Sequence, residues 1–256
     1  DDFEGAKSSI DLKHIGSWFL ASTPQLQNDL FPEATMSSLE YGKNRAKLAW
    51  YIIDPLFYDR SGTYRPGNIS SDELSKNSTR QVLETEVFPN KQNPNNITTN
   101  IAVLNLAYFP EEKGSYNYDV NPGPVSAGLN DDGTLADPES RWGGIMRKIE
   151  SSDFEAANIE YIEFWMMDPF AEEPYSSSSG DLFINLGEVS EDILRDGRKA
   201  YENGLPVSSQ KTNVDPTIWG QVPTLQALVE SFSNEPGSRQ YQDVGYDGIS
   251  SEEETT

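Results

Sequence analysis

The chain carries few of the side chains that catalysis near neutral pH usually needs. His14 is its only histidine, and cysteine is absent. A Ser-His-Asp or metal-histidine mechanism would therefore depend on His14 alone, because imidazole is the group that titrates near neutrality. The sequence also lacks the G-x-S-x-G, H-E-x-x-H, P-loop and G-x-G-x-x-G motifs. We expect a protein that is not an enzyme.

Carboxylates are plentiful, and glycoside hydrolysis needs only two of them at a set separation. Among the 42 Asp and Glu residues, the most visible pair is Glu160 and Glu163. Three positions apart on a strand, these two side chains point to opposite faces and cannot act together. A glycosidase therefore stays a distant alternative.

Tyr161, Glu163 and Trp165 recur at every second position, so on a strand they share one face. Two aromatic rings and a carboxylate are the groups that stack on a pyranose and accept its hydroxyls, which makes these three residues candidate ligand-binding residues. The alternative is that the rings fill a packed layer of the core, where large aromatic side chains of strands usually lie.

Net charge excludes whole classes of partner. The chain has 19 Lys and Arg against 42 Asp and Glu, a net charge of −23. Nucleic acid phosphates and anionic lipid both require clustered cations, so we expect no nucleic acid partner and no direct lipid insertion. No run of 18 apolar residues and no N-terminal export signal occur in the sequence, so an exported location would imply a segment of a longer protein.

The elements that must position these residues are mostly strands. Segments rich in β-branched and aromatic residues lie between turn signals, and 36% of the residues are hydrophobic, which is enough for a sizeable core. The expected strands are residues 3–12, 17–22, 47–54, 98–109, 142–149, 159–167 and 181–187, with a further strand possible at 79–88. The expected core includes Trp50, Ile52, Leu104, Leu106, Ile162, Phe164, Leu182, Ile184 and Leu186.

Helices are few, and loops are long. The spacing of Leu225, Leu228, Val229 and Phe232 predicts one amphipathic helix, and Ser190 could cap a second short one before Gly197. We expect a single β-sandwich domain over residues 1–233 with loop insertions at about 58–98 and 114–140. Residues 234–256 form an acidic tail that should be flexible.

Two sets of residues in this sequence resemble known protein families. Asp1-Asp2-Phe3-Glu4, Trp18, Trp142 and the Tyr-Ile-Glu-Phe-Trp string at 161–165 are similar to the jelly-roll of galactose-binding-like and carbohydrate-binding modules. The resemblance implies an all-β jelly-roll sandwich with long loops and one or two short helices, and a carbohydrate-binding module as the alternative function. Such modules commonly hold a structural Ca²⁺ between the first strand and the end of the chain. Here Asp2 or Glu4 would meet Asp243 or Asp247 around that ion, since Ca²⁺ prefers several carboxylate oxygens.

A second resemblance covers nearly the whole chain. Its strings lie at residues 1–12, 17–25, 41–58, 141–170, 180–206 and 242–248, including YGKNRAKLAWYIIDPLFY and GDLFINLGEVSEDILRDGRKAYENGLP. Together they resemble the SprA family, also called Sov, the giant outer-membrane translocons of the Bacteroidota type IX secretion system, which also serves gliding motility. The family forms a very large β-barrel, through which folded cargo leaves the cell, with a PorV-like outer-membrane partner and a periplasmic plug protein.

At 256 residues the chain is too short for that barrel, and none of its segments shows the banded pattern of a lipid-facing strand. The resemblance therefore implies a non-catalytic domain inserted between barrel strands, with a structural cap or gating role in protein export. Its expected partners are the remainder of the barrel, the PorV-like protein, the plug protein and secreted cargo. Its expected place is the outer membrane, as an extracellular cap or in the barrel lumen.

Overall fold

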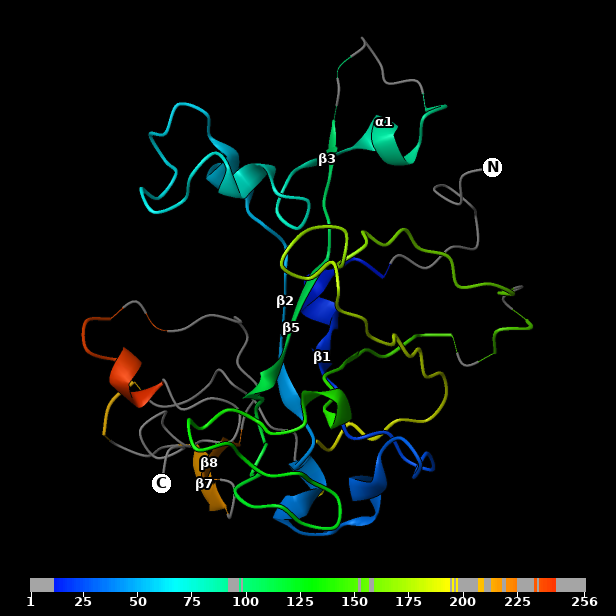
Figure 1. Cartoon of the computed structure of the whole chain (residues 1–256), viewed down its shortest axis with the longest axis vertical. Helices are drawn as coiled ribbons and strands as arrows, with labels where there is room; N and C mark the ends of the chain where they lie inside the picture. The colour runs from blue at the N-terminus through cyan, green and yellow to red at the C-terminus, as the bar shows by residue number, and fades with distance from the viewer. Residues whose placement is uncertain are drawn as a thin grey trace. The chain divides into compact units, whose positions relative to one another are not determined.

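The strands of this protein are short and pair two by two. The computed structural model describes residues 12–91, 97, 99–151, 153–156, 159–193, 195, 197, 207–209, 213–217, 220–224, 233 and 235–242. Within these residues the chain is mostly non-helical, and its strands form two-stranded sheets joined by turns and long irregular segments (Figure 1). The fold is therefore β-rich, as the strand patterns predicted.

Three of the sheets are antiparallel ribbons with a defined register. β1 (Phe19–Leu20) pairs with β6 (Ile145–Met146), so that Leu20 lies opposite Ile145. β3 (Val82–Leu83) pairs with β4 (Asn100–Ile101). β7 (Val214–Thr217) pairs with β8 (Gly220–Pro223).

The longest strands form the fourth sheet, in which β2 (Ala46–Tyr51) pairs with β5 (Asn105–Lys113). Pro110 lies inside β5, where it has no N–H to donate, so β5 can tolerate it only as an edge strand. On the surface of this sheet Lys47 Nζ lies 2.5 Å from Glu112 Oε2 and 5.1 Å from the centre of the Phe109 ring. A salt bridge and a cation–π contact therefore join β2 to β5 across the surface of this sheet.

In the described part of the chain, helical structure is limited to single turns. α1 covers only Glu84–Val87, and the 3₁₀ turns are Ile15–Ser17, Pro32–Thr35, Leu39–Gly42, Pro55–Tyr58, Glu73–Ser75, Pro138–Ser140 and Arg239–Tyr241. None of the helices in the described part of the chain has the length and apolar character needed to cross a membrane.

The chain divides into two compact units. Unit 1 comprises Asp1–Trp18, Ala49–Leu106 and Arg147–Ile184, and unit 2 comprises Phe19–Leu48, Ala107–Met146 and Asn185–Thr256. Among the described residues of unit 1, Val82 is the single buried hydrophobic residue. The buried side chains of unit 2 include Phe31, Tyr41, Tyr116 and Leu135, together with an equally large polar set to which Arg45, Asp119 and Arg141 belong.

Most strand predictions fall on or beside observed strands. β1 and β6 lie within the expected strands at 17–22 and 142–149. β2 overlaps the expected strand at 47–54, and β4 and β5 overlap the one at 98–109. The possible strand at 79–88 is divided between β3 and α1. Residues 190–193 form no helix although Ser190 Oγ accepts the predicted hydrogen bond from the N–H of Asp192. Residues 3–11 and the helix predicted around Leu225 to Phe232 lie outside the described residues.

The predicted strands at 159–167 and 181–187 are wrong in the described structure, since neither segment is paired in a sheet. Most of the predicted core residues are not buried either. Trp50 and Leu104 are half-buried, whereas Ile52, Leu106, Ile162, Phe164, Leu182, Ile184 and Leu186 are exposed. Alternating apolar residues become buried only if a second sheet covers them, and the described residues contain no such sheet. They establish a β-rich chain and not the two packed sheets of a jelly-roll.

The expected division into a domain over 1–233 and a tail over 234–256 stays a prediction, because residues 243–256 lie outside the described ones.

Gly42 offers a direct test of the packing in unit 2. A Cβ at this position would lie 1.8 Å from the backbone oxygen of Tyr116, which cannot move without shifting the loop that follows β5. We expect Gly42→Ala to lower the free energy of unfolding by about 3 kcal/mol, in the range of overpacked sites. Gly67→Ala is the matched control, because a Cβ there meets nothing within 4 Å. Urea titration of both variants makes the comparison, and equal stabilities would contradict this packing.

Candidate functional site

The three candidate ligand-binding residues lie together in a segment without regular structure. Tyr161, Glu163 and Trp165 belong to residues 159–167, which form neither helix nor strand. Tyr161 is 76% exposed and Trp165 is 67% exposed, and Glu163 is exposed beside them. The alternative interpretation, in which these rings fill a packed core layer, does not describe this structure.

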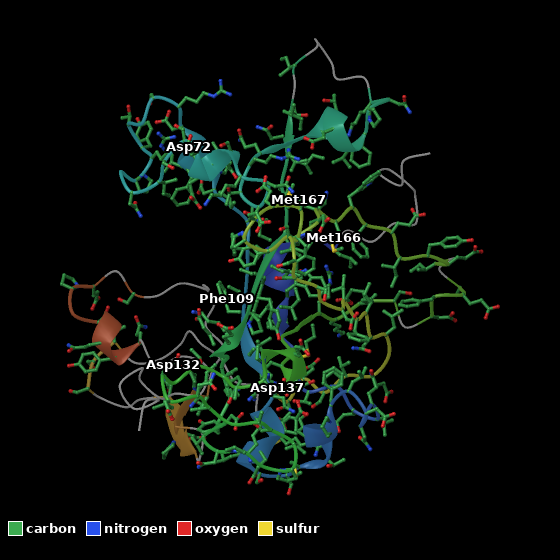
Figure 2. All side chains as sticks on the ribbon, in the orientation of Figure 1. Asp72, Phe109, Asp132, Asp137, Met166 and Met167 are labelled. Carbon is green, nitrogen blue, oxygen red and sulfur yellow. The ribbon has the colours of Figure 1, made fainter. Side chains whose placement is uncertain are left out.

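The same segment exposes an unusual amount of apolar surface. Ile162, Phe164 and Met166 alternate in sequence with the candidate residues and are also exposed. Figure 2 labels Met166 and Met167 at its end. No hydrogen bond connects the backbone of residues 160–167 with any other described residue. We call residues 159–167 the open segment.

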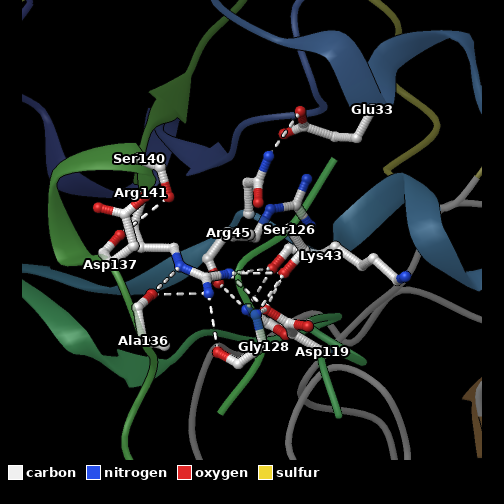
Figure 3. A network of polar contacts seen from close by, with 12 residues as sticks. Glu33, Lys43, Arg45, Asp119, Ser126, Gly128, Ala136, Asp137, Ser140 and Arg141 are labelled. Carbon is white, nitrogen blue, oxygen red and sulfur yellow. Dashed lines mark hydrogen bonds and ion pairs between the residues drawn. The ribbon is translucent and has the colours of Figure 1, made fainter. Parts of the chain in front are cut away.

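A buried ion pair organises the other notable site, which lies wholly in unit 2 (Figure 3). Arg141 Nη1 lies 2.6 Å from Asp119 Oδ2, and both side chains are 0% exposed. Gly128 N–H and the Ser126 hydroxyl donate to the same carboxylate oxygen. Because these donors surround one oxygen, the charge of Asp119 is compensated although water is excluded.

The guanidinium of Arg141 also binds three backbone carbonyls. Its donors reach the oxygens of Ala136, Gly128 and Lys43 at 2.8 to 3.0 Å. A planar fork of five N–H groups can make all of these bonds at once, which an ammonium cannot. Arg141 thus ties the loop between β5 and β6 to the turn that precedes β2.

A second buried cluster lies around Glu33. Its carboxylate accepts hydrogen bonds from Trp142 Nε1 at 2.7 Å and from Asn44 Nδ2 at 3.1 Å. Burial raises the pKa of the Glu33 carboxyl above its ordinary value, and the bonds from Trp142 and Asn44 oppose that shift. The carboxylate therefore remains costly to ionise even with good donors beside it.

Arg45 shares this polar core. Its guanidinium donates to the Ala21 carbonyl at 3.0 Å and lies 5.1 Å from the centre of the Trp142 ring. Burial lowers the pKa of Arg45 to about 10, against the opposing influence of Tyr116, Tyr41 and Glu33. The arrangement combines a cation–π contact with buried hydrogen bonds, which holds the turn before β2 rigid.

The buried network has the features of a structural site. Asp119 and Glu33 are engaged by Arg141, Trp142 and Asn44, so neither carboxylate is presented to a substrate. His14 Nδ1 lies 3.2 Å from Ser17 Oγ, but both groups are exposed in a short turn and no described carboxylate binds the imidazole. The described part of the chain therefore presents no nucleophile with an oriented base.

The metal candidates receive no structural description. Asp2, Glu4, Asp243 and Asp247 all lie outside the described residues. Within those residues no group of three His, Cys, Asp or Glu side chains could hold a metal ion. Asp132 instead accepts hydrogen bonds from the Thr134 hydroxyl and N–H, and these lower the pKa of its carboxyl.

Sequence reasoning missed the buried network. Asp119 and Arg141 lie 22 positions apart, in and just after a stretch that composition marks as a loop. Nothing in their local sequence distinguishes a buried charge from a solvated one. The resemblance strings at 41–58 and 141–170, which include Lys43, Arg45 and Arg141, are the only sequence signals given above for this site.

Comparison with known proteins adds no relative: no family model matches this chain, and no curated protein matches it.

The raised pKa of Glu33 predicts a pH dependence of stability. The contribution of a carboxyl with a raised folded-state pKa is fully present below its unfolded-state pKa of about 4.3 and is lost as pH rises through the folded-state value. We therefore expect the free energy of unfolding of the native chain, relative to Glu33→Gln, to decrease as the pH rises above about 4.3. Denaturant titrations across this range provide the measurement. Glu139→Gln, which removes an exposed carboxyl, controls for the change in net charge, and a difference that is constant with pH would contradict the prediction.

Proposed function

We propose that this chain is a non-catalytic structural module of a type IX secretion outer-membrane translocon, with a cap or gating role in protein export. The observation that carries the proposal is the open segment, whose large apolar side chains are exposed along a backbone that pairs with no other described residue. A free-standing domain would bury such a segment, since large exposed apolar patches mark interaction surfaces. A module built into a larger assembly would cover it with that assembly.

The buried residues of the two units support the same interpretation. Unit 2 is held by buried polar groups such as Arg141 and Asp119, whereas the described residues of unit 1 bury almost no apolar side chain. Hydrophobic burial is the main favourable term in folding, and the described residues of unit 1 contribute little of it. We propose that a jelly-roll sandwich is completed in the parent protein, where strands at 159–167 and 181–187 acquire partners.

The resemblance supports the identity of those partners. The SprA-like strings at 141–170 and 180–206 include the open segment and the other exposed apolar stretch. The partners we propose are therefore the remainder of the barrel, a PorV-like outer-membrane protein, the plug protein and passing cargo. The location we propose is the cell-surface side of the outer membrane or the barrel lumen.

Site-directed photo-crosslinking in the bacterium tests this function. A photoreactive side chain replacing Trp165 in the full reading frame should crosslink to the barrel or to the PorV-like partner, because Trp165 belongs to the covered surface. The same replacement at Tyr64 is the matched control, since Tyr64 is also 67% exposed but lies outside the open segment. A reading frame that contains no barrel, or equal crosslinking from both positions, would overturn the proposal.

Carbohydrate binding is the second candidate, and the exposure of Tyr161 and Trp165 favours it. Both rings are free to stack on a sugar, with the Glu163 carboxylate beside them as an acceptor. If this surface binds glycans, Trp165→Ala should abolish binding on a glycan array, while a change at the equally exposed Tyr64 should leave binding intact. An array on which the native chain binds no glycan would exclude this function.

A further inference from the structure

The open segment has the composition and the free backbone of a β-strand that lacks its neighbour. Residues 160–167 include no proline, so each of them has an N–H to donate. None of these N–H groups, and none of the carbonyls, bonds to another described residue. Backbone N–H and C=O groups are obligatory hydrogen-bonding groups, so this exposed segment offers an unpaired edge to which another strand can add.

The charges within the stretch of sequence that contains the open segment all have one sign. Residues 159–184, the part of unit 1 that contains it, have no Lys, Arg or His and six acidic residues: Glu160, Glu163, Asp168, Glu172, Glu173 and Asp181. A second copy of the chain would bring the same charges, in addition to a net charge of −23, against the first. A neighbouring strand with Lys or Arg between its apolar residues would instead pair opposite charges across the ladder.

We propose that the open segment accepts a β-strand supplied by the surrounding assembly, from outside these 256 residues and not from a second copy of them, and that this strand alternates apolar residues with Lys or Arg. The proposal rests on the proposed function in naming the kind of segment that the surrounding assembly supplies. Backbone hydrogen bonds provide the affinity of such strand addition, and side chains of alternate residues provide its specificity. Glu163 is the central charge that selects a cationic strand, while Phe164 and Trp165 supply apolar surface on the two faces.

A synthetic peptide that alternates valine and lysine is the probe, and hydrogen exchange of the purified 256-residue chain is the readout. The amides of residues 160–167 should exchange rapidly in the free chain and become protected when the peptide is added. A peptide of the same sequence with every second amide N-methylated keeps the charge but loses the hydrogen-bonding edge. It should give no protection, whereas adsorption driven by charge alone would protect the segment equally with both peptides and overturn the proposal.

Proline substitutions test the ladder from the side of the protein. Successive residues of a strand present their N–H groups to opposite edges, so Phe164→Pro and Trp165→Pro each block one edge. We expect one of these two variants to weaken peptide binding at least about tenfold, whichever lies on the pairing edge. Ser177→Pro, which changes an exposed residue outside the segment, should bind normally. Unaltered binding by both Phe164→Pro and Trp165→Pro would overturn the proposal.

Three further outcomes have defined meanings. Protection of residues 160–167 in the chain without peptide would show that the segment already has a partner strand within the chain, and would overturn the proposal. Concentration-dependent dimerisation with the same protection would assign the edge to a second copy and overturn it as well. Equal binding of a peptide that alternates valine and glutamate would show that the segment does not select cationic strands, and would overturn that part of the proposal. Because these measurements use the isolated chain, they stand independently of the crosslinking in the bacterium that tests the proposed function.

Discussion

The buried pairing of Arg141 with Asp119 is the interaction on which the rest of unit 2 depends. Removing either partner would leave a charge in a site that water does not reach, which is far more costly than the modest net gain of an intact pair. Because Arg141 also holds the carbonyls of Lys43, Gly128 and Ala136, one side chain fixes the loop between β5 and β6 against the turn before β2. Geometry of this kind favours one arrangement of the loop over many compact alternatives.

A core built this way differs from the usual apolar core of a β-protein. Glu33, Arg45 and Asp119 are as deeply buried as Tyr41 and Leu135, and each is satisfied in part by directional bonds. Such groups contribute specificity more than stability, since their desolvation offsets most of the Coulombic gain. The large apolar side chains that would supply stability, among them Phe164 and Ile184, are instead exposed. This imbalance is the physical reason for proposing that a larger assembly covers those side chains.

The exposed open segment gives both candidate functions a common physical basis. Exposed aromatic rings can stack on a sugar, and a backbone without hydrogen-bond partners can accept a strand. The two functions compete for Tyr161 and Trp165, because a strand laid along the segment would cover one of their faces. The lack of Lys and Arg in residues 159–184 makes a cationic strand the better electrostatic match, whereas a neutral sugar would gain little from those charges.

The sequence by itself determined the composition-dependent features. It predicted a β-rich, mostly non-helical chain and the positions of β1, β2, β5 and β6, because strand propensity is a local property. Only the tertiary structure decided which residues are buried. Phe164 and Ile184 alternate as core residues do and yet are exposed, since burial requires a covering sheet that no local pattern contains. Conversely, Asp119 and Arg141 look like loop residues and are fully buried, because a charge can leave water only where a distant partner and several carbonyls converge on it.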